Sequence, residues 1–125
     1  MRAPEPMPGI RVAARPEVLD RLAWPTGVTT LRFAADEMLA LGATDTPEPS
    51  VTAEPEAGFV GWQLTAEEVA ATVLPHLEWP LPVARPALAQ GLIAGVPAKL
   101  QLGVDGRALL LVARAYAHEL MERLS

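Results

Sequence analysis

Cysteine is absent from this 125-residue chain, which excludes a disulfide framework and a thiolate metal site. Long apolar runs are also absent, because charged residues or prolines interrupt every window of about 18 residues, the length that a membrane helix needs. The first nine residues lack the apolar run of a secretory signal, so we expect none there. Together these absences favour a cytoplasmic protein without a membrane partner.

Positive charge is missing from the middle of the chain, since no lysine or arginine occurs between Phe33 and Ala84. The acidic residues of this stretch are Asp36, Glu37, Asp45, Glu48, Glu54, Glu56, Glu67, Glu68 and Glu78. The net charge of -5 therefore comes from the middle, and it disfavours attraction to nucleic acid, so we predict no nucleic-acid partner. An acidic middle fits either an ordinary solvated surface or a face that docks a positively charged partner.

Residue types that carry out catalysis or bind metals are scarce and scattered. His118 and Glu122 would lie on one face of a helix, but no third metal ligand accompanies them. Ser50 falls in an acidic loop and Ser125 is the last residue, so neither occupies the strand-turn-helix position of a nucleophile. We therefore expect no catalytic residue, no metal ligand, no cofactor-binding residue and no cofactor.

Prolines and glycines divide the chain into short predicted elements. We expect helices at Pro16–Leu22, Ala66–Leu74, Pro86–Ile93 and Arg114–Leu124, and strands at Val28–Phe33, Gly58–Leu64, Pro97–Leu102 and Arg107–Val112. Residues 36–41 fit either a strand or one helical turn. Residues 1–9 are expected to form a flexible arm, and residues 44–57 an acidic, Pro-rich loop.

Two local signals define the fold class. Thr65 followed by Glu68 is a capping box at the start of a helix. An Asp-Gly pair in the turn 103–106 predicts an antiparallel hairpin over residues 97–112. The mixture of strands and helices predicts the α+β class: a small single domain, residues 1–125, with an antiparallel sheet that includes this hairpin and helices packed on one face. The C-terminal helix is expected to turn Tyr116, Leu120, Met121 and Leu124 inward.

Three tryptophans stand out in so small a chain. Trp62 alternates within a predicted strand and is expected to lie in the core. Trp24 and Trp79 each precede a proline, so they are either lids over a small core or contact anchors for a partner. We select a candidate partner-contact surface that combines these two tryptophans with the acidic segment: Trp24, Trp79, Glu48, Glu54 and Glu56.

Several segments of the chain resemble a known family. Residues 89–100, 105–112 and 114–124 resemble the C-terminal part of sarcosine oxidase gamma subunits, in which Leu-Ala-Gly-Val-Pro leads into a hairpin and a closing helix with an aromatic-Ala step. Residues 31–42 and 58–71 look like earlier segments of the same family. The resemblance implies an aminomethyltransferase-like, folate-binding fold. It also implies a subunit that carries no flavin or nicotinamide and assembles with larger catalytic subunits.

These observations lead to one functional hypothesis and two alternatives. The first is a non-catalytic accessory or subunit-type protein that acts by protein–protein association with a protein partner or as a homo-oligomer. It would be a gamma-like subunit of an amine or one-carbon oxidoreductase. The second is a binding protein or enzyme for a folate-like or other small molecule. The third is an acidic dedicated chaperone for a basic client.

Overall fold

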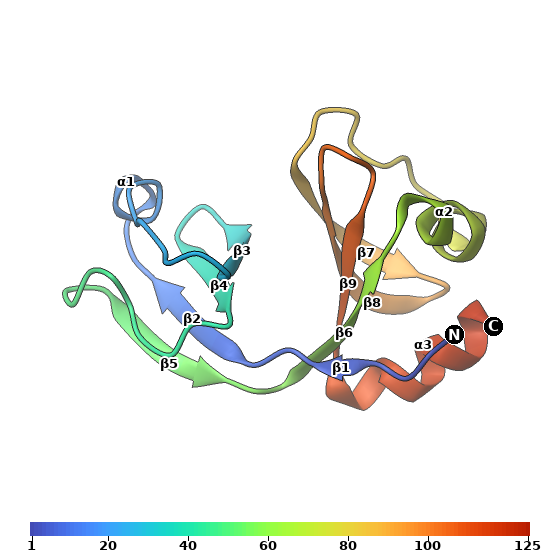
Figure 1. Cartoon of the computed structure of the whole chain (residues 1–125), viewed down its shortest axis with the longest axis horizontal. Helices are drawn as coiled ribbons and strands as arrows, with labels where there is room; N and C mark the ends of the chain where they lie inside the picture. The colour runs from blue at the N-terminus through green and yellow to red at the C-terminus, as the bar shows by residue number, and fades with distance from the viewer. The chain divides into compact units, whose positions relative to one another are not determined.

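The strands of this chain form two antiparallel sheets, accompanied by three short α-helices (Figure 1). The structure is a computed structural model that describes all residues, Met1–Ser125. The chain divides into two compact units. Unit 1 consists of Met1–Pro6 and Phe59–Ser125, and unit 2 consists of Met7–Gly58. Each unit contains one of the two sheets, so each is described separately.

Unit 1 contains a five-stranded sheet in the order β1-β6-β9-β8-β7. Its strands are β1 (Glu5–Pro6), β6 (Phe59–Leu64), β7 (Ala87–Ile93), β8 (Val96–Leu102) and β9 (Ala108–Ala113). Its helical segments are α2 (Ala66–Glu68), the π-helical η1 (Val69–Val73), the 3-10 segments η2 (Leu74–His76) and η3 (Arg114–Tyr116), and α3 (Ala117–Leu124). No helix of the chain has the length and apolar character that crossing a membrane requires.

The core of unit 1 lies between one face of this sheet and the helical segments. Trp62 of β6 is buried there as predicted, and its indole N–H donates to the carbonyl oxygen of Arg2 at 2.8 Å. Val73 of η1 and Leu120 of α3 are fully buried in the same cluster. Both helical segments therefore pack on one face of an antiparallel sheet, which confirms the predicted α+β class.

The two local signals read from the sequence form as predicted. The Thr65 hydroxyl accepts from the amide of Glu68 at 3.1 Å, and the Glu68 carboxylate accepts from the amide of Thr65 at 3.0 Å. These bonds satisfy two amides that the first helical turn leaves without partners. The hairpin of β8 and β9 turns at Gly106, whose φ of 86° is accessible to glycine at little cost.

Unit 2 contains a four-stranded sheet in the order β3-β4-β2-β5. Its elements are β2 (Gly9–Ala13), α1 (Pro16–Leu19), β3 (Thr29–Ala34), β4 (Glu37–Leu41) and β5 (Thr52–Glu56). Ile10 and Val12 of β2 are buried with Leu19 of α1 on one face of this sheet. The alternation of β2 therefore places its apolar residues against the helix.

An ion-pair network spans three strands of unit 2. The Arg11 guanidinium donates to Glu37 at 2.8 Å and to Glu56 at 2.7 Å, and it lies 5.6 Å from the ring centroid of Phe33. Burial lowers the pKa of Arg11, but hydrogen bonds and charge from Glu56 and Glu37 outweigh it and raise that pKa above its ordinary value. The network therefore links β2 to both of its neighbours, β4 and β5.

One predicted helix is a strand. Residues 86–93 were expected to be helical, but Ala87–Ile93 form β7 and pair along their whole length with β8. Alanine, leucine and glutamine favour a helix, but propensity is worth less than about 1 kcal/mol per residue and pairing with β8 overrides it. The burial of β7 follows the period of a strand, since Ala89 and Ile93 are buried while Leu92 is exposed.

Three further expectations differ from the structure. Residues 1–9 contain β1 and the start of β2 rather than only an unpaired arm, because β1 pairs with β6. Residues 44–57 contain β5, which pairs with β2 although it includes Pro55. As an edge strand, β5 tolerates a proline that faces away from its neighbour. Tyr116 was expected to face inward but lies exposed in η3, before the regular turn of α3 begins.

Candidate functional site

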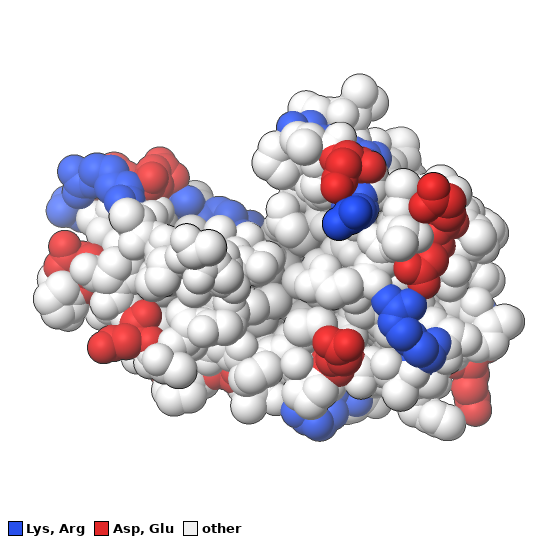
Figure 2. All heavy atoms as spheres, in the orientation of Figure 1, with Lys and Arg blue, Asp and Glu red and all other residues white.

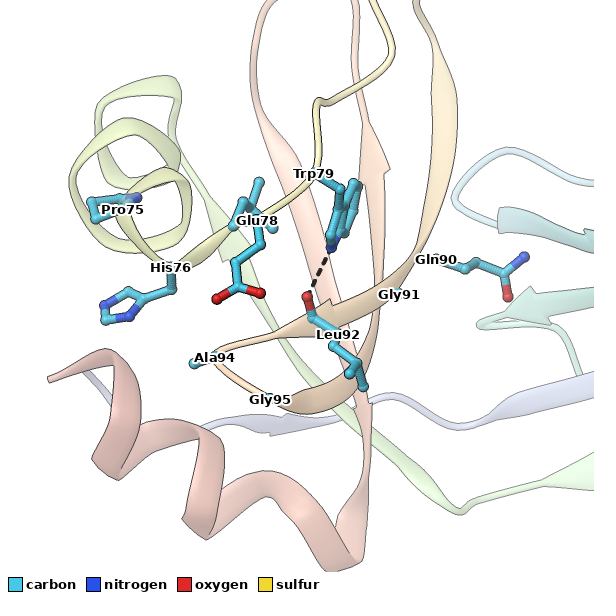
Figure 3. Close-up of a pocket in the computed structure, with 10 residues that line it drawn as sticks. Pro75, His76, Glu78, Trp79, Gln90, Gly91, Leu92, Ala94 and Gly95 are labelled. Carbon is cyan, nitrogen blue, oxygen red and sulfur yellow. Dashed lines mark hydrogen bonds between the residues drawn. The ribbon is translucent and has the colours of Figure 1, made fainter.

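A groove beside β7 is the candidate functional site of unit 1. The residues Pro75–Trp79 form one wall, and residues Gln90–Leu92 with the turn Ala94–Gly95 form the other (Figure 3). The groove holds about 520 Å³. It is open to solvent, and it runs along a strand that has a neighbouring strand on one side only.

Trp79 is fixed in this groove by a glycine and by a backbone carbonyl. A Cβ atom added to Gly91 would lie 3.2 Å from the indole ring, so the absence of a side chain there makes room for Trp79. The indole N–H donates to the carbonyl oxygen of Leu92 at 2.9 Å (Figure 3). The ring also packs against the core of unit 1. These contacts therefore fix the position of the Trp79 ring in the groove wall.

The second wall of the groove ends in a two-residue hairpin turn between β7 and β8. Ala94 and Gly95 have φ values of 51° and 79°, the left-handed values that the favoured hairpin turn requires at both positions. Arg123 of α3 donates to the carbonyl oxygen of Ala94 at 2.7 Å, and the Ala94 amide donates to the carbonyl oxygen of His76 at 3.3 Å. The turn is therefore tied to α3 and to the opposite wall.

Leu92 is the most exposed large apolar residue of the groove, with 56% of its surface accessible. It also lines a second hollow of about 300 Å³ together with Phe59, Pro97 and Tyr116. Leu92 therefore lines two hollows, and the second is lined mostly by apolar residues together with Gln90 and Lys99.

The free side of β7 presents alternate backbone groups. Because a two-residue turn joins β7 to β8, Ile93 and Val96 exchange hydrogen bonds, and every second residue back along β7 does the same. The N–H and C=O groups of Leu88, Gln90 and Leu92 consequently point away from β8. The Leu92 carbonyl accepts from Trp79, which covers this end of the edge.

The two tryptophans predicted as partner contacts lie in different units. Trp79 lines the groove of unit 1, whereas Trp24 packs partly buried against the core of unit 2. The indole nitrogen of Trp24 is buried and has no hydrogen-bond partner. Trp79 therefore stands beside an open groove, and Trp24 has the lid position that the sequence left open as an alternative.

The three glutamates predicted as partner contacts differ in their surroundings. Glu56 pairs with Arg11. Glu48 accepts hydrogen bonds from the amide and hydroxyl of Ser50, and these bonds lower the pKa of Glu48. Glu54 is exposed in β5. On the face that Figure 2 shows, acidic side chains form separate small groups, several of which lie beside basic side chains.

The His118–Glu122 pair forms on α3 as an exposed contact of 3.0 Å. No group of three histidine, aspartate or glutamate side chains that could hold a metal ion occurs in the 125 described residues.

The β7 edge is the feature that the sequence analysis missed. Leu88 and Leu92 were placed in a predicted helix, so their common edge could not be recognised. The alternation of small residues at 87, 89 and 91 with larger ones at 88, 90 and 92 is the available signal for a strand.

Comparisons with protein-family models, with curated proteins and with solved structures found no match for this chain.

Proposed function

We propose that this chain is a non-catalytic, subunit-type protein that acts by protein–protein association through the β7 edge of unit 1. The observation that supports it is the position of Leu92. This leucine is 56% exposed on an edge strand, where it lines two hollows beside a tryptophan that the fold holds in place.

The energetics of such a surface favour a partner. Away from the end that Trp79 covers, the β7 edge still offers backbone groups that a second chain can pair with. Burying the exposed part of Leu92 would contribute about 1 kcal/mol, because full burial of a leucine contributes about 1.5–3 kcal/mol. Trp79 and the turn at Ala94 are already ordered by hydrogen bonds, so little side-chain entropy would be lost on association.

The resemblance to sarcosine oxidase gamma subunits supplies the kind of partner for this proposal. It implies association with larger catalytic subunits of an amine or one-carbon oxidoreductase. Under the proposal, the catalytic chemistry belongs to the partner, and this chain contributes a binding surface.

The test compares two exposed leucines of unit 1. The full chain is tagged and purified from its native cells as the parent protein, as Leu92→Glu and as the control Leu74→Glu. Leu74 is 44% exposed and lines neither hollow, so the control introduces the same charge elsewhere. We expect one stoichiometric protein to accompany the parent and Leu74→Glu, and to be lost from Leu92→Glu.

Two results would overturn the proposal. One is a parent chain that purifies as a monomer with no stoichiometric protein. The other is equal retention of the partner by Leu92→Glu and Leu74→Glu, since association would then not involve the β7 edge. Circular dichroism of both variants verifies that they are folded.

Binding of a small molecule in the Trp79 groove is a second candidate function. The groove volume of about 520 Å³ lies within the range of about 300–1,000 Å³ that is typical of ligand sites. Thermal-shift measurements with folates and amines test it, because a ligand at 100 times its dissociation constant adds about 2.7 kcal/mol to the stability. Absence of any shift across these ligands would exclude them as occupants.

A further inference from the structure

Two loops at one end of unit 1 expose the most accessible large apolar side chains of the chain. Val83 is 96% exposed and Val104 is 78% exposed. Val83 lies in the connection that precedes β7, and Val104 lies in the turn between β8 and β9; both loops project from the same end of the sheet (Figure 1). The two valines line one shallow hollow of about 660 Å³.

Both loops are held in place by contacts within unit 1. In the β8–β9 turn, the amide of Gly103 donates to the carbonyl oxygen of Arg107 at 2.8 Å, and Gly106 lies against Ala66 of α2. In the other loop, Leu81 packs against the core of unit 1, and the Arg85 guanidinium donates to the carbonyl oxygen of Pro82 at 3.3 Å. Each valine is thus displayed by an ordered loop, which limits the entropy lost when a partner covers it.

The charges around the hollow have a positive surplus. Arg107 pairs with Asp105 at 3.4 Å, and the two charges offset each other. Arg85 lines the same hollow and forms no ion pair with any carboxylate of the chain. A partner that covers both valines would therefore place its own surface beside one uncompensated guanidinium.

We propose that the Val83–Val104 hollow is a second contact surface and that it receives an apolar segment of a partner protein bearing a carboxylate beside Arg85. This inference rests on the proposed function, because it assumes that the chain associates with a protein. Apolar residues of the partner would bury the two valines. The partner's carboxylate would accept two hydrogen bonds from the Arg85 guanidinium.

Site-specific photo-crosslinking in the native cells tests this proposal. The photoreactive residue p-benzoylphenylalanine replaces Val83 or Val104 in the full chain, and a third chain carries it at Leu74 as the control. We expect Val83 and Val104 positions to crosslink to the same protein, at a segment in which apolar residues flank Asp or Glu. The Leu74 position should give no such adduct. Adding Arg85→Glu should lower the adduct yield about five-fold, the factor expected for a surface ion pair.

Other outcomes would overturn this second surface. They are the absence of adducts at both valines, adducts to lipid, adducts to a basic segment, or a yield unaffected by Arg85→Glu. Purification of the same chains separates this failure from that of the proposed function. If the partner still copurifies but no adduct forms at the valines, only the second surface is wrong. If no partner copurifies, the proposed function itself fails.

Discussion

Replacing Trp79 with phenylalanine tests whether the indole N–H holds the groove wall. Trp79→Phe removes the donor that bonds the carbonyl oxygen of Leu92 at 2.9 Å, which costs about 1 kcal/mol net. It also removes roughly 40 Å² of apolar surface packed on the core, at about 25 cal/mol per Å², or about 1 kcal/mol more. The expected loss in the free energy of unfolding is therefore about 2 kcal/mol.

Trp24→Phe is the matched control. The same ring area is lost, but the indole nitrogen of Trp24 is buried without a hydrogen-bond partner. Removing an unsatisfied buried donor recovers about 1–3 kcal/mol, which offsets the lost area. We therefore expect Trp24→Phe to be nearly neutral or stabilising.

Urea unfolding followed by circular dichroism measures both variants. Because Trp79 belongs to unit 1 and Trp24 to unit 2, hydrogen exchange followed by mass spectrometry assigns each change to its unit. The reasoning is refuted if Trp24→Phe destabilises its unit as much as Trp79→Phe destabilises unit 1, since the hydrogen bond to Leu92 would then make no net contribution.

Three further predictions concern the elements that support the two sheets. Ala94→Asn should stabilise the β7–β8 turn by about 0.5–1 kcal/mol, because asparagine tolerates the φ of 51° better than alanine; a lower urea midpoint would contradict this. Arg11→Met should destabilise unit 2 by about 1–2 kcal/mol at neutral pH, because it leaves the partly buried carboxylates of Glu37 and Glu56 without a cation. A urea midpoint equal to that of the parent chain would count against this prediction. The amide of Thr65 and the guanidinium of Arg2 lower the pKa of Glu68 in the folded chain. Its contribution to stability is therefore complete above its ordinary pKa of 4.5 and is lost as the pH falls through the lower folded value. Glu68→Gln should accordingly flatten the stability profile below pH 4.5, and a profile identical to that of the parent would contradict the assignment.

Local sequence signals predicted those parts of the fold whose cause is itself local. The capping box at Thr65 and the Asp-Gly turn act within a few residues, so the helix start and the β8–β9 hairpin could be read directly. The β7 strand could not, because its conformation depends on pairing with β8 rather than on its own propensities. The same holds for β5, which contains a proline and acidic residues and forms by pairing with β2.

The candidate site was only partly accessible from the sequence for the same reason. Trp79 was selected because a tryptophan before a proline stands out in a connection. The groove forms because Gly91 and the turn at Ala94 lie opposite the Pro75–Trp79 segment. Their position follows from the pairing of β7 with β8. The exposed Leu92 could be recognised only once the edge was known. Glu56 was selected as part of the acidic segment, and the fold pairs it with Arg11.

Hydrogen exchange of the complex tests the central claim that the β7 edge carries association. The chain is purified with its partner, and amide exchange is compared with that of the isolated chain by mass spectrometry. We expect exchange to slow in the peptide covering Ala87–Ile93, while β3 (Thr29–Ala34), the edge strand of the other sheet, exchanges unchanged. Unchanged exchange in Ala87–Ile93, with protection confined to other segments, would contradict the claim.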